Sequence, residues 1–227
     1  MSSFRDKVSY PVLYVLDGQY MHSIIDGTRV NLDFKNSIED VIIVGVGSGR
    51  DLESWQSNRT YEFTQSQDSS VKRYASGGAE KFLNCLKKEI IPFVDEHYKT
   101  NSDNGIMGHS LAGLFVTYCF VNSPDSFDRY AMSSPSLMWK ESEMLKQAER
   151  VLLENKISGL PFKKAFVSVG GEEETLMISG AFKFCSMVKE RNYENLDLTW
   201  HVFEGETHMS VVSGMISRAL STLYDKK

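Results

Sequence analysis

Short apolar runs without polar alternation recur along this sequence, and stretches of helical length separate them. Residues 11–16 (PVLYVL), 41–46 (VIIVGV) and 164–169 (KAFVSV) are examples, and residues 196–203 read as a last strand. Uninterrupted apolar runs are typical of strands that helices cover on both faces of a parallel sheet. The alternation of strands and helices predicts an α/β fold with a doubly wound, mostly parallel sheet. We expect residues 1–227 to form a single domain.

The connecting segments differ in character. Residues 79–98 predict a long amphipathic helix that Pro92 interrupts. Its apolar stripe comprises Phe82, Leu83, Leu86, Ile90, Phe93 and Val94. Residues 47–78 are polar and rich in turn formers, so we expect an irregular binding loop or lid there. The spacing of apolar residues after position 208 predicts a closing helix.

Composition limits the classes of partner and compartment. The 227-residue chain has a net charge of −5 and no basic cluster, which disfavours a nucleic-acid partner. No run approaches the roughly 18 apolar residues of a membrane-spanning helix, so we expect no membrane partner. Three cysteines, Cys85, Cys119 and Cys185, fall within helical apolar patterns. We expect reduced, buried thiols and therefore a cytoplasmic location.

A serine lies between small residues where an apolar run meets a helical pattern. The segment 105–113 (GIMGHSLAG) predicts a strand, a sharp turn at Ser110 and the start of a helix. This arrangement is typical of a nucleophile elbow, in which a tight turn exposes the hydroxyl and its neighbours must be small. We therefore select Ser110 as the candidate nucleophile. The alternative without a catalytic role is a serine that caps the N-terminus of a helix.

A serine nucleophile needs a base within hydrogen-bond reach, and imidazole suits that task near neutral pH. We choose His208, which follows the last predicted strand in a glycine-containing loop. His22 and His97 lie in predicted helices and His201 in a strand. His109 adjoins the serine with its side chain pointing away from that of Ser110, and we assign it to substrate binding.

A carboxylate behind the imidazole would hold its tautomer. The acidic run 172–174 follows the strand before the last one, where this group belongs, and we select Glu173 with Glu172 and Glu174 as alternatives. Glu204 and Glu206 are further candidates because they lie near His208 in the sequence. The plain alternative for the acidic run is favourable charge at a helix start.

Negative charge on a substrate carbonyl oxygen requires fixed donors. The backbone N–H of Leu111, directly after the nucleophile, is one candidate. The loop after the first predicted strand supplies the other, through the backbone of Gly18 or Gln19, because glycine permits a close approach there.

These segments, taken together, resemble one esterase family along nearly the whole chain. The matching segments are YPVLYVLDG (10–18), IIVGV (42–46), RTYEFT (59–64), EIIPF (89–93), GHSLAGLF (108–115), SPSLMW (134–139) and FEGETH (203–208). The family includes enterochelin and other siderophore esterases, S-formylglutathione hydrolase and the antigen 85 mycolyltransferases. The resemblance implies an α/β-hydrolase fold and a serine esterase acting on a small-molecule ester. It also implies that Arg59 and Trp139 line the substrate cleft.

Two departures from that family stand out. Ala112 replaces the commoner glycine, a sterically mild change. Relatives also carry two further strands before residue 10, and in the hydrolase sheet these would pair beside residues 41–46. Their absence here would leave an apolar edge bare. We expect the N-terminal residues to cover this edge, or a second copy of the chain to pair with it as a homodimer.

The leading functional hypothesis is hydrolysis of a carboxylic ester through an acyl-enzyme on Ser110. Acyl transfer to an alcohol at the same site is one alternative. A catalytically inactive hydrolase fold used for binding is another. The histidines show no i, i+4 pairing with a carboxylate, so we expect neither a metal site nor a cofactor.

Overall fold

The computed structural model describes residues 9–34, 37–154 and 157–226 of the chain. Six parallel strands form one sheet in the spatial order β2-β1-β3-β4-β5-β6. The strands are β1 (Tyr10–Leu16), β2 (Ile42–Val46), β3 (Thr100–His109), β4 (Arg129–Ser133), β5 (Lys163–Gly170) and β6 (Leu196–Phe203). The predicted α/β fold with a parallel sheet is confirmed.

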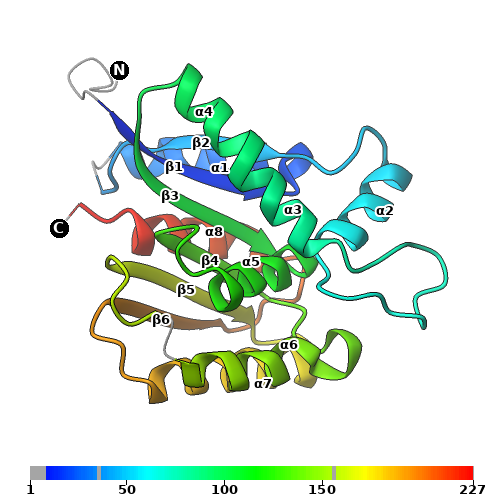
Figure 1. Cartoon of the computed structure of the whole chain (residues 1–227). Coiled ribbons are helices and arrows are strands. Elements are labelled where there is room, and N and C mark those ends of the chain that lie inside the picture. Colours follow the sequence, from blue (N-terminus) through cyan, green and yellow to red (C-terminus); the bar gives the residue numbers. More distant parts are fainter. Residues whose placement is uncertain (1–8, 35–36, 155–156, 227) are drawn as a thin grey trace.

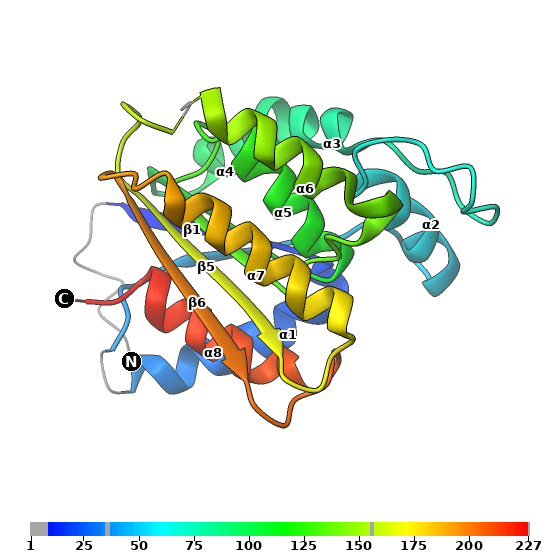
Figure 2. The ribbon, with the colours of Figure 1, turned by 90° about the horizontal axis from the view of Figure 1, so that it is seen from below.

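Helices cover both faces of this sheet (Figure 1; Figure 2). One face carries α1 (Gly18–Asp33) and α8 (Val211–Leu223), which pack against each other. The other face carries α3 (Ala79–Cys85), α4 (Ile91–His97), α5 (Leu111–Asn122), α6 (Trp139–Val151) and α7 (Thr175–Glu190), and a short 3₁₀ turn, Leu152–Glu154, follows α6. Each face has its own buried apolar cluster. All strands point the same way, so the loops that leave their carboxyl ends gather at one rim, where α/β sheets place their ligands.

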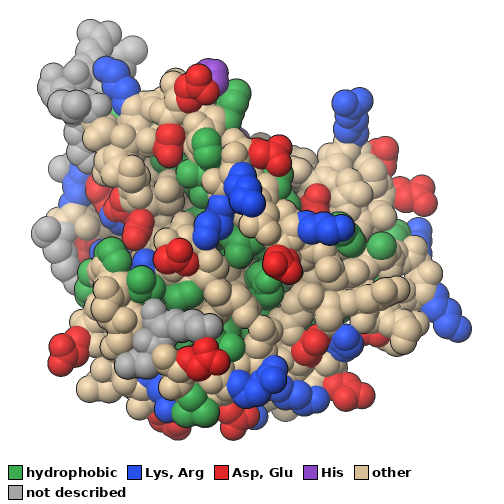
Figure 3. All heavy atoms as spheres, in the orientation of Figure 1, with side chains coloured by type: hydrophobic (Ala, Val, Ile, Leu, Met, Phe, Trp, Pro, Cys, Tyr) green, Lys and Arg blue, Asp and Glu red, His purple; other side chains and the backbone are tan. Residues whose placement is uncertain are grey.

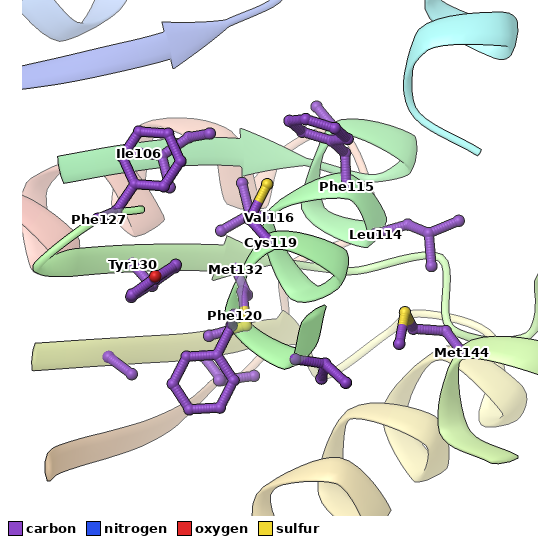
Figure 4. Packing of buried hydrophobic residues seen from close by; sticks show 14 of the residues in the cluster. Ile106, Leu114, Phe115, Val116, Cys119, Phe120, Phe127, Tyr130, Met132 and Met144 are labelled. Atoms are coloured by element: carbon purple, nitrogen blue, oxygen red, sulfur yellow. The ribbon is translucent and has the colours of Figure 1, made fainter. Parts of the chain in front are cut away.

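Helix α5 is the most deeply buried of the helices next to the sheet. Its side chains Val116, Cys119 and Phe120 point toward β3 and β4, where Tyr130 and Met132 meet them (Figure 4). Phe120 packs edge-on against Tyr130 with ring centroids 5.2 Å apart. This packing fixes the helix against the sheet, and with it the residue that begins the helix.

The segment 79–98 is helical as predicted, but it is not one regular helix. A π-helical turn, Leu86–Ile90, separates α3 from α4, and Pro92 sits in the first turn of α4. The wider turn suits a proline, which has no N–H to donate to the preceding turn. The π-helical turn contains one residue more than an α-helical turn, so the apolar residues after it are rotated around the helix axis. Phe93, which we expected on the buried stripe, is 57 % exposed, and that prediction is wrong.

The segment 47–78 is not irregular throughout, contrary to our expectation. It contains helix α2 (Leu52–Glu62), which lies beyond the carboxyl ends of the strands (Figure 1). A capping box formed by Asp51 and Ser54 starts this helix. The sequence pattern did not reveal it because Thr60 is its only fully buried residue, so it has no continuous apolar stripe.

Strand β2 lies at one edge of the described sheet. The expected N-terminal cover concerns residues 1–8, which are outside the described residues. Pairing with a second copy stays a prediction.

The three cysteines carry free thiols. Cys119 and Cys185 are buried and Cys85 is half-buried, in line with the expected reduced state. Within the described ranges, none of the helices is both long and apolar enough to cross a membrane. Lysine and arginine side chains mix with acidic ones over the face drawn in Figure 3.

Candidate active site

Ser110 forms the whole turn between β3, which ends at His109, and α5, which begins at Leu111. Its backbone has φ 62° and ψ −120°, a conformation that residues other than glycine rarely adopt. The Ser110 amide donates to the Ser133 carbonyl over 3.0 Å, and the Ser110 carbonyl accepts from the Leu114 amide over 2.9 Å. Bonds on both sides therefore hold the serine in its strained turn.

Glycines on either side of the serine allow this turn to close. A Cβ on Gly108 would lie 2.4 Å from the Ala112 carbonyl oxygen, and one on Gly113 would lie 2.7 Å from the Ser133 carbonyl oxygen. Neither contact is sterically possible. Ala112 is fully buried without such a clash, so the departure from the common glycine is accommodated.

The hydroxyl, imidazole and carboxyl groups selected from the sequence form one hydrogen-bonded chain. His208 Nε2 lies 3.0 Å from Ser110 Oγ, and His208 Nδ1 lies 2.8 Å from Glu173 Oε2. The three residues come from the loops after β3, β5 and β6, which meet at the carboxyl rim of the sheet. The Glu173 side chain is 1 % exposed and that of His208 is 34 % exposed, so the chain runs from the interior toward solvent.

Glu173 is held as an anion by its neighbours. Its Oε1 accepts hydrogen bonds from the Ser134 hydroxyl and the Gly170 amide, each over 2.6 Å. Burial raises the pKa of Glu173, but the hydrogen bonds from His208, Ser134 and Gly170 outweigh burial and leave the pKa below its ordinary value. An ionised carboxylate fixes the His208 Nδ1 proton and leaves Nε2 free to accept a proton from Ser110.

The other glutamates considered do not reach His208. Glu172, Glu174 and Glu204 are exposed, and Glu174 precedes the first residue of α7. The Glu206 carboxylate accepts a hydrogen bond from Ser210. Of the five candidates, only Glu173 contacts the imidazole in this structure.

His109 does not lie on the cleft surface, contrary to its assignment to substrate binding. It is 3 % exposed, and its ring packs against that of His208 with centroids 4.5 Å apart. As the last residue of β3 it points back from the turn into the protein. Burial lowers the pKa of His109 to about 4, and the nearby His208 adds to this effect. The His109 ring is therefore neutral at neutral pH, and it packs against one side of the His208 imidazole.

The loop after β1 brings the proposed second backbone donor to the same rim. Asp17 has the left-handed conformation, φ 54° and ψ 38°, directly before α1. The first amides of α1, those of Gly18 and Gln19, have no partner within the helix. A Cβ on Gly18 would lie 2.5 Å from the Gly45 carbonyl carbon, so only glycine allows α1 to begin this close to β2. Leu111 is the first residue of α5, so its amide also has no partner within its helix.

Arg59, which the resemblance assigns to the substrate cleft, is paired with Asp17 in this structure. Its guanidinium donates to both carboxylate oxygens of Asp17, over 3.0 and 2.8 Å, and the Trp55 indole N–H donates to the same carboxylate over 2.7 Å. The Asp17 side chain is 1 % exposed and that of Arg59 is 14 % exposed. Arg59 therefore anchors the loop before α1 from α2. Trp139 is half-buried at the start of α6, against the apolar cluster around α5.

Comparison with known proteins identifies the family of the chain. The model of the family described as "Putative esterase" matches residues 2–211. The chain belongs to this esterase family. It is 28 % identical over 230 residues to the ferri-bacillibactin esterase BesA of Bacillus subtilis, covering 93 % of this chain and 78 % of the relative. It is 24 % identical over 240 residues to a siderophore triacetylfusarinine C esterase of Aspergillus fumigatus, covering 95 % and 82 %.

The solved structure of the BES protein from Bacillus cereus superposes on the esterase with a TM-score of 0.83 at 29 % identity. The match covers 95 % of this chain and 83 % of that chain.

Sequence reasoning missed four residues that shape the site of this esterase. Ser134 supports Glu173, and the Ser136 hydroxyl lies 3.4 Å from Ser110 Oγ. Asp17 and Trp55 form the anchor with Arg59. The segment SPSLMW had been matched to the family as a whole, but nothing in it distinguished a serine that bonds to a carboxylate 39 positions away. Only the meeting of the β4 and β5 loops reveals that contact.

Proposed function

We propose that the protein is a serine esterase that cleaves a carboxylic ester through an acyl-enzyme on Ser110, with His208 as the general base and Glu173 as its orienting carboxylate. The observation that carries the proposal is the hydrogen-bonded chain Ser110 Oγ, His208 Nε2, His208 Nδ1 and Glu173 Oε2, at 3.0 and 2.8 Å. A hydroxyl, a base and an orienting group in sequence are the geometric mark of an activated serine.

The proposed reaction has two halves. Ser110 Oγ attacks the ester carbonyl carbon while its proton moves to His208 Nε2, and the amides of Leu111 and of Gly18 or Gln19 donate to the oxyanion. The intermediate collapses, the carbon–oxygen bond to the alcohol breaks, and His208 returns the proton to the alcohol oxygen. Water then gives a proton to His208 Nε2 and attacks the acyl carbon. The bond from that carbon to Ser110 Oγ breaks, the acid leaves, and His208 returns the proton to Ser110 Oγ.

We further propose an ester of the siderophore class as substrate, because the relatives are esterases of ferri-bacillibactin and triacetylfusarinine C. Enterobactin, the substrate named for another relative, is a suitable probe. Mass spectrometry would show the gain of one water per bond cleaved.

The basic test uses p-nitrophenyl acetate and butyrate with the wild type and Ser110→Ala. Turnover by the wild type that Ser110→Ala abolishes supports the proposal. Labelling of Ser110 by a fluorophosphonate separates it from an inactive binding protein, since only an activated serine reacts. An added alcohol distinguishes the two enzymes, because an acyltransferase would form a new ester with it. A wild type that neither labels nor turns over any ester contradicts the proposal.

A further inference from the structure

An open pocket of about 500 Å³ adjoins the catalytic rim between α1 and α2. Its apolar walls are Tyr20 from α1, Leu52 and Trp55 from α2, and Met209 from the loop before α8, and Gln19 completes it next to the oxyanion loop. These residues come from three separate parts of the chain. Leu52 and Trp55 belong to the segment 47–78, which we expected to be a binding loop or lid, whereas Tyr20 and Met209 had no assigned role.

The pocket exposes several large apolar side chains. Leu52 and Met209 are each 68 % exposed, and the rings of Tyr20 and Trp55 meet edge-on with centroids 5.7 Å apart. Large apolar side chains gathered in a hollow beside a reactive group mark a ligand site better than single exposed residues do. The charged residues at its edge, Arg50 and Asp51, are of opposite sign, so the pocket has no net charge to attract an ion.

The position of the pocket indicates which part of an ester it would hold. Met209 directly follows His208, whose Nε2 must return a proton to the departing alcohol oxygen. The alcohol part of the substrate therefore leaves the reacting carbon on the side of His208 and Met209. Gln19, whose backbone amide is a proposed oxyanion donor, also lines the pocket. The pocket therefore adjoins both the proposed oxyanion site and His208.

We propose that this pocket, formed by Tyr20, Leu52, Trp55 and Met209 with Gln19, binds an uncharged aromatic ring on the alcohol part of the ester. The proposal rests on the proposed function of Ser110 and His208. A dry cavity of about 150 Å³ is enough for benzene, so the pocket has room for a ring and its linker. Edge-on aromatic packing and the thioether of Met209 both favour a ring over a straight chain of equal size.

The test compares kcat/KM for three esters by titration of the acid released. Benzyl acetate and methyl phenylacetate are isomers that carry the ring on the alcohol side and on the acyl side, and methyl acetate carries no ring. Both acetates form the same acetyl-enzyme, so their deacylation steps are identical and any difference arises in acylation. We expect kcat/KM for benzyl acetate to exceed that for methyl acetate by about tenfold, and to exceed that for methyl phenylacetate.

The variants Leu52→Ser and Met209→Ser each remove one wall, and their exposure means that folding tolerates them. Each should lower the ratio of kcat/KM for benzyl acetate to kcat/KM for methyl acetate to within about threefold of unity. Leu153→Ser, at a leucine after α6 that is 63 % exposed, is the matched control and should keep the wild-type ratio. Trp55 is left intact because its indole N–H also holds Asp17.

An unchanged ratio in both wall variants would overturn the proposal, as would a wild type that favours methyl phenylacetate or ignores the ring. Failure of the proposed function would give a different result from failure of the pocket proposal. In that case none of the three esters is turned over and a fluorophosphonate does not label Ser110.

Discussion

The replacement Arg59→Met tests whether α2 positions the oxyanion loop. It removes the two hydrogen bonds that the guanidinium donates to Asp17 and leaves the carboxylate, 1 % exposed, with the Trp55 indole as its remaining side-chain donor. Methionine retains most of the apolar stem of the arginine side chain. It lacks the guanidinium, whose carbon lies 5.0 Å from the centroid of the Trp55 ring and 5.6 Å from that of the Phe63 ring. The variant therefore removes charge more than volume.

The expected cost follows from the burial of the pair. Removing one partner of a buried ion pair costs about 3–5 kcal/mol, because the other charge stays buried without compensation. The Trp55 hydrogen bond remains and Arg59 is partly solvated, so we expect the lower end, about 3 kcal/mol. For a chain of this size each 1 kcal/mol lowers Tm by about 2–4 °C, which gives a fall of about 6–12 °C.

The effect on activity has a separate origin. Asp17 must turn toward solvent to recover hydration, and the Gly18 amide moves with it. Loss of one oxyanion donor lowers kcat by about 10²–10³. We expect about a hundredfold loss in kcat for p-nitrophenyl butyrate, with a much smaller change in KM, because the oxyanion forms only in the transition state.

Urea unfolding and steady-state kinetics measure the two effects. Arg73→Met, at an exposed arginine, is the control for loss of one positive charge. The double variant Asp17→Asn with Arg59→Met removes both charges of this ion pair, and asparagine tolerates the left-handed backbone at position 17. The double variant should therefore regain part of the lost stability. If Arg59→Met unfolded and hydrolysed ester as the wild type does, the anchor would have no role in either property.

Three further predictions concern the elbow and its imidazole. Glu173→Gln should lower kcat by about 10³–10⁴ with the fold retained in circular dichroism, whereas the exposed Glu174→Gln should change kcat less than twofold. His109 has a folded pKa of about 4. The unfolded chain therefore takes up a proton below about pH 6.5 while the folded one does not, and stability falls from there to about pH 4. His109→Gln should flatten that fall by up to about 1.4 kcal/mol per pH unit in urea titrations, and an unchanged slope would exclude His109 as its source. Gly108→Ala should abolish soluble expression or activity, because its Cβ would meet the Ala112 carbonyl at 2.4 Å; a fully active variant would show that the turn can shift.

The sequence by itself predicted the alternation of strands and helices and the residues at the ends of three strands. Uninterrupted apolar runs can be satisfied only in a sheet covered on both faces, and the chain order of serine, acid and histidine then assigns each group to the same rim. Ser110, Glu173 and His208 could be selected because each follows a recognisable strand.

Tertiary structure decided which partners the side chains have. The sequence did not indicate that Arg59 is hydrogen-bonded to a carboxylate 42 positions away, or that His109 is buried against the ring of His208. Helix α2 was not predicted because it lies at the carboxyl rim of the sheet rather than against the core. Its sequence therefore has no continuous stripe of apolar residues at helical spacing. Local patterns report burial and backbone preference. They do not report which loops meet in space, and the anchor at Asp17 and the pocket beside Met209 exist only because three such loops meet.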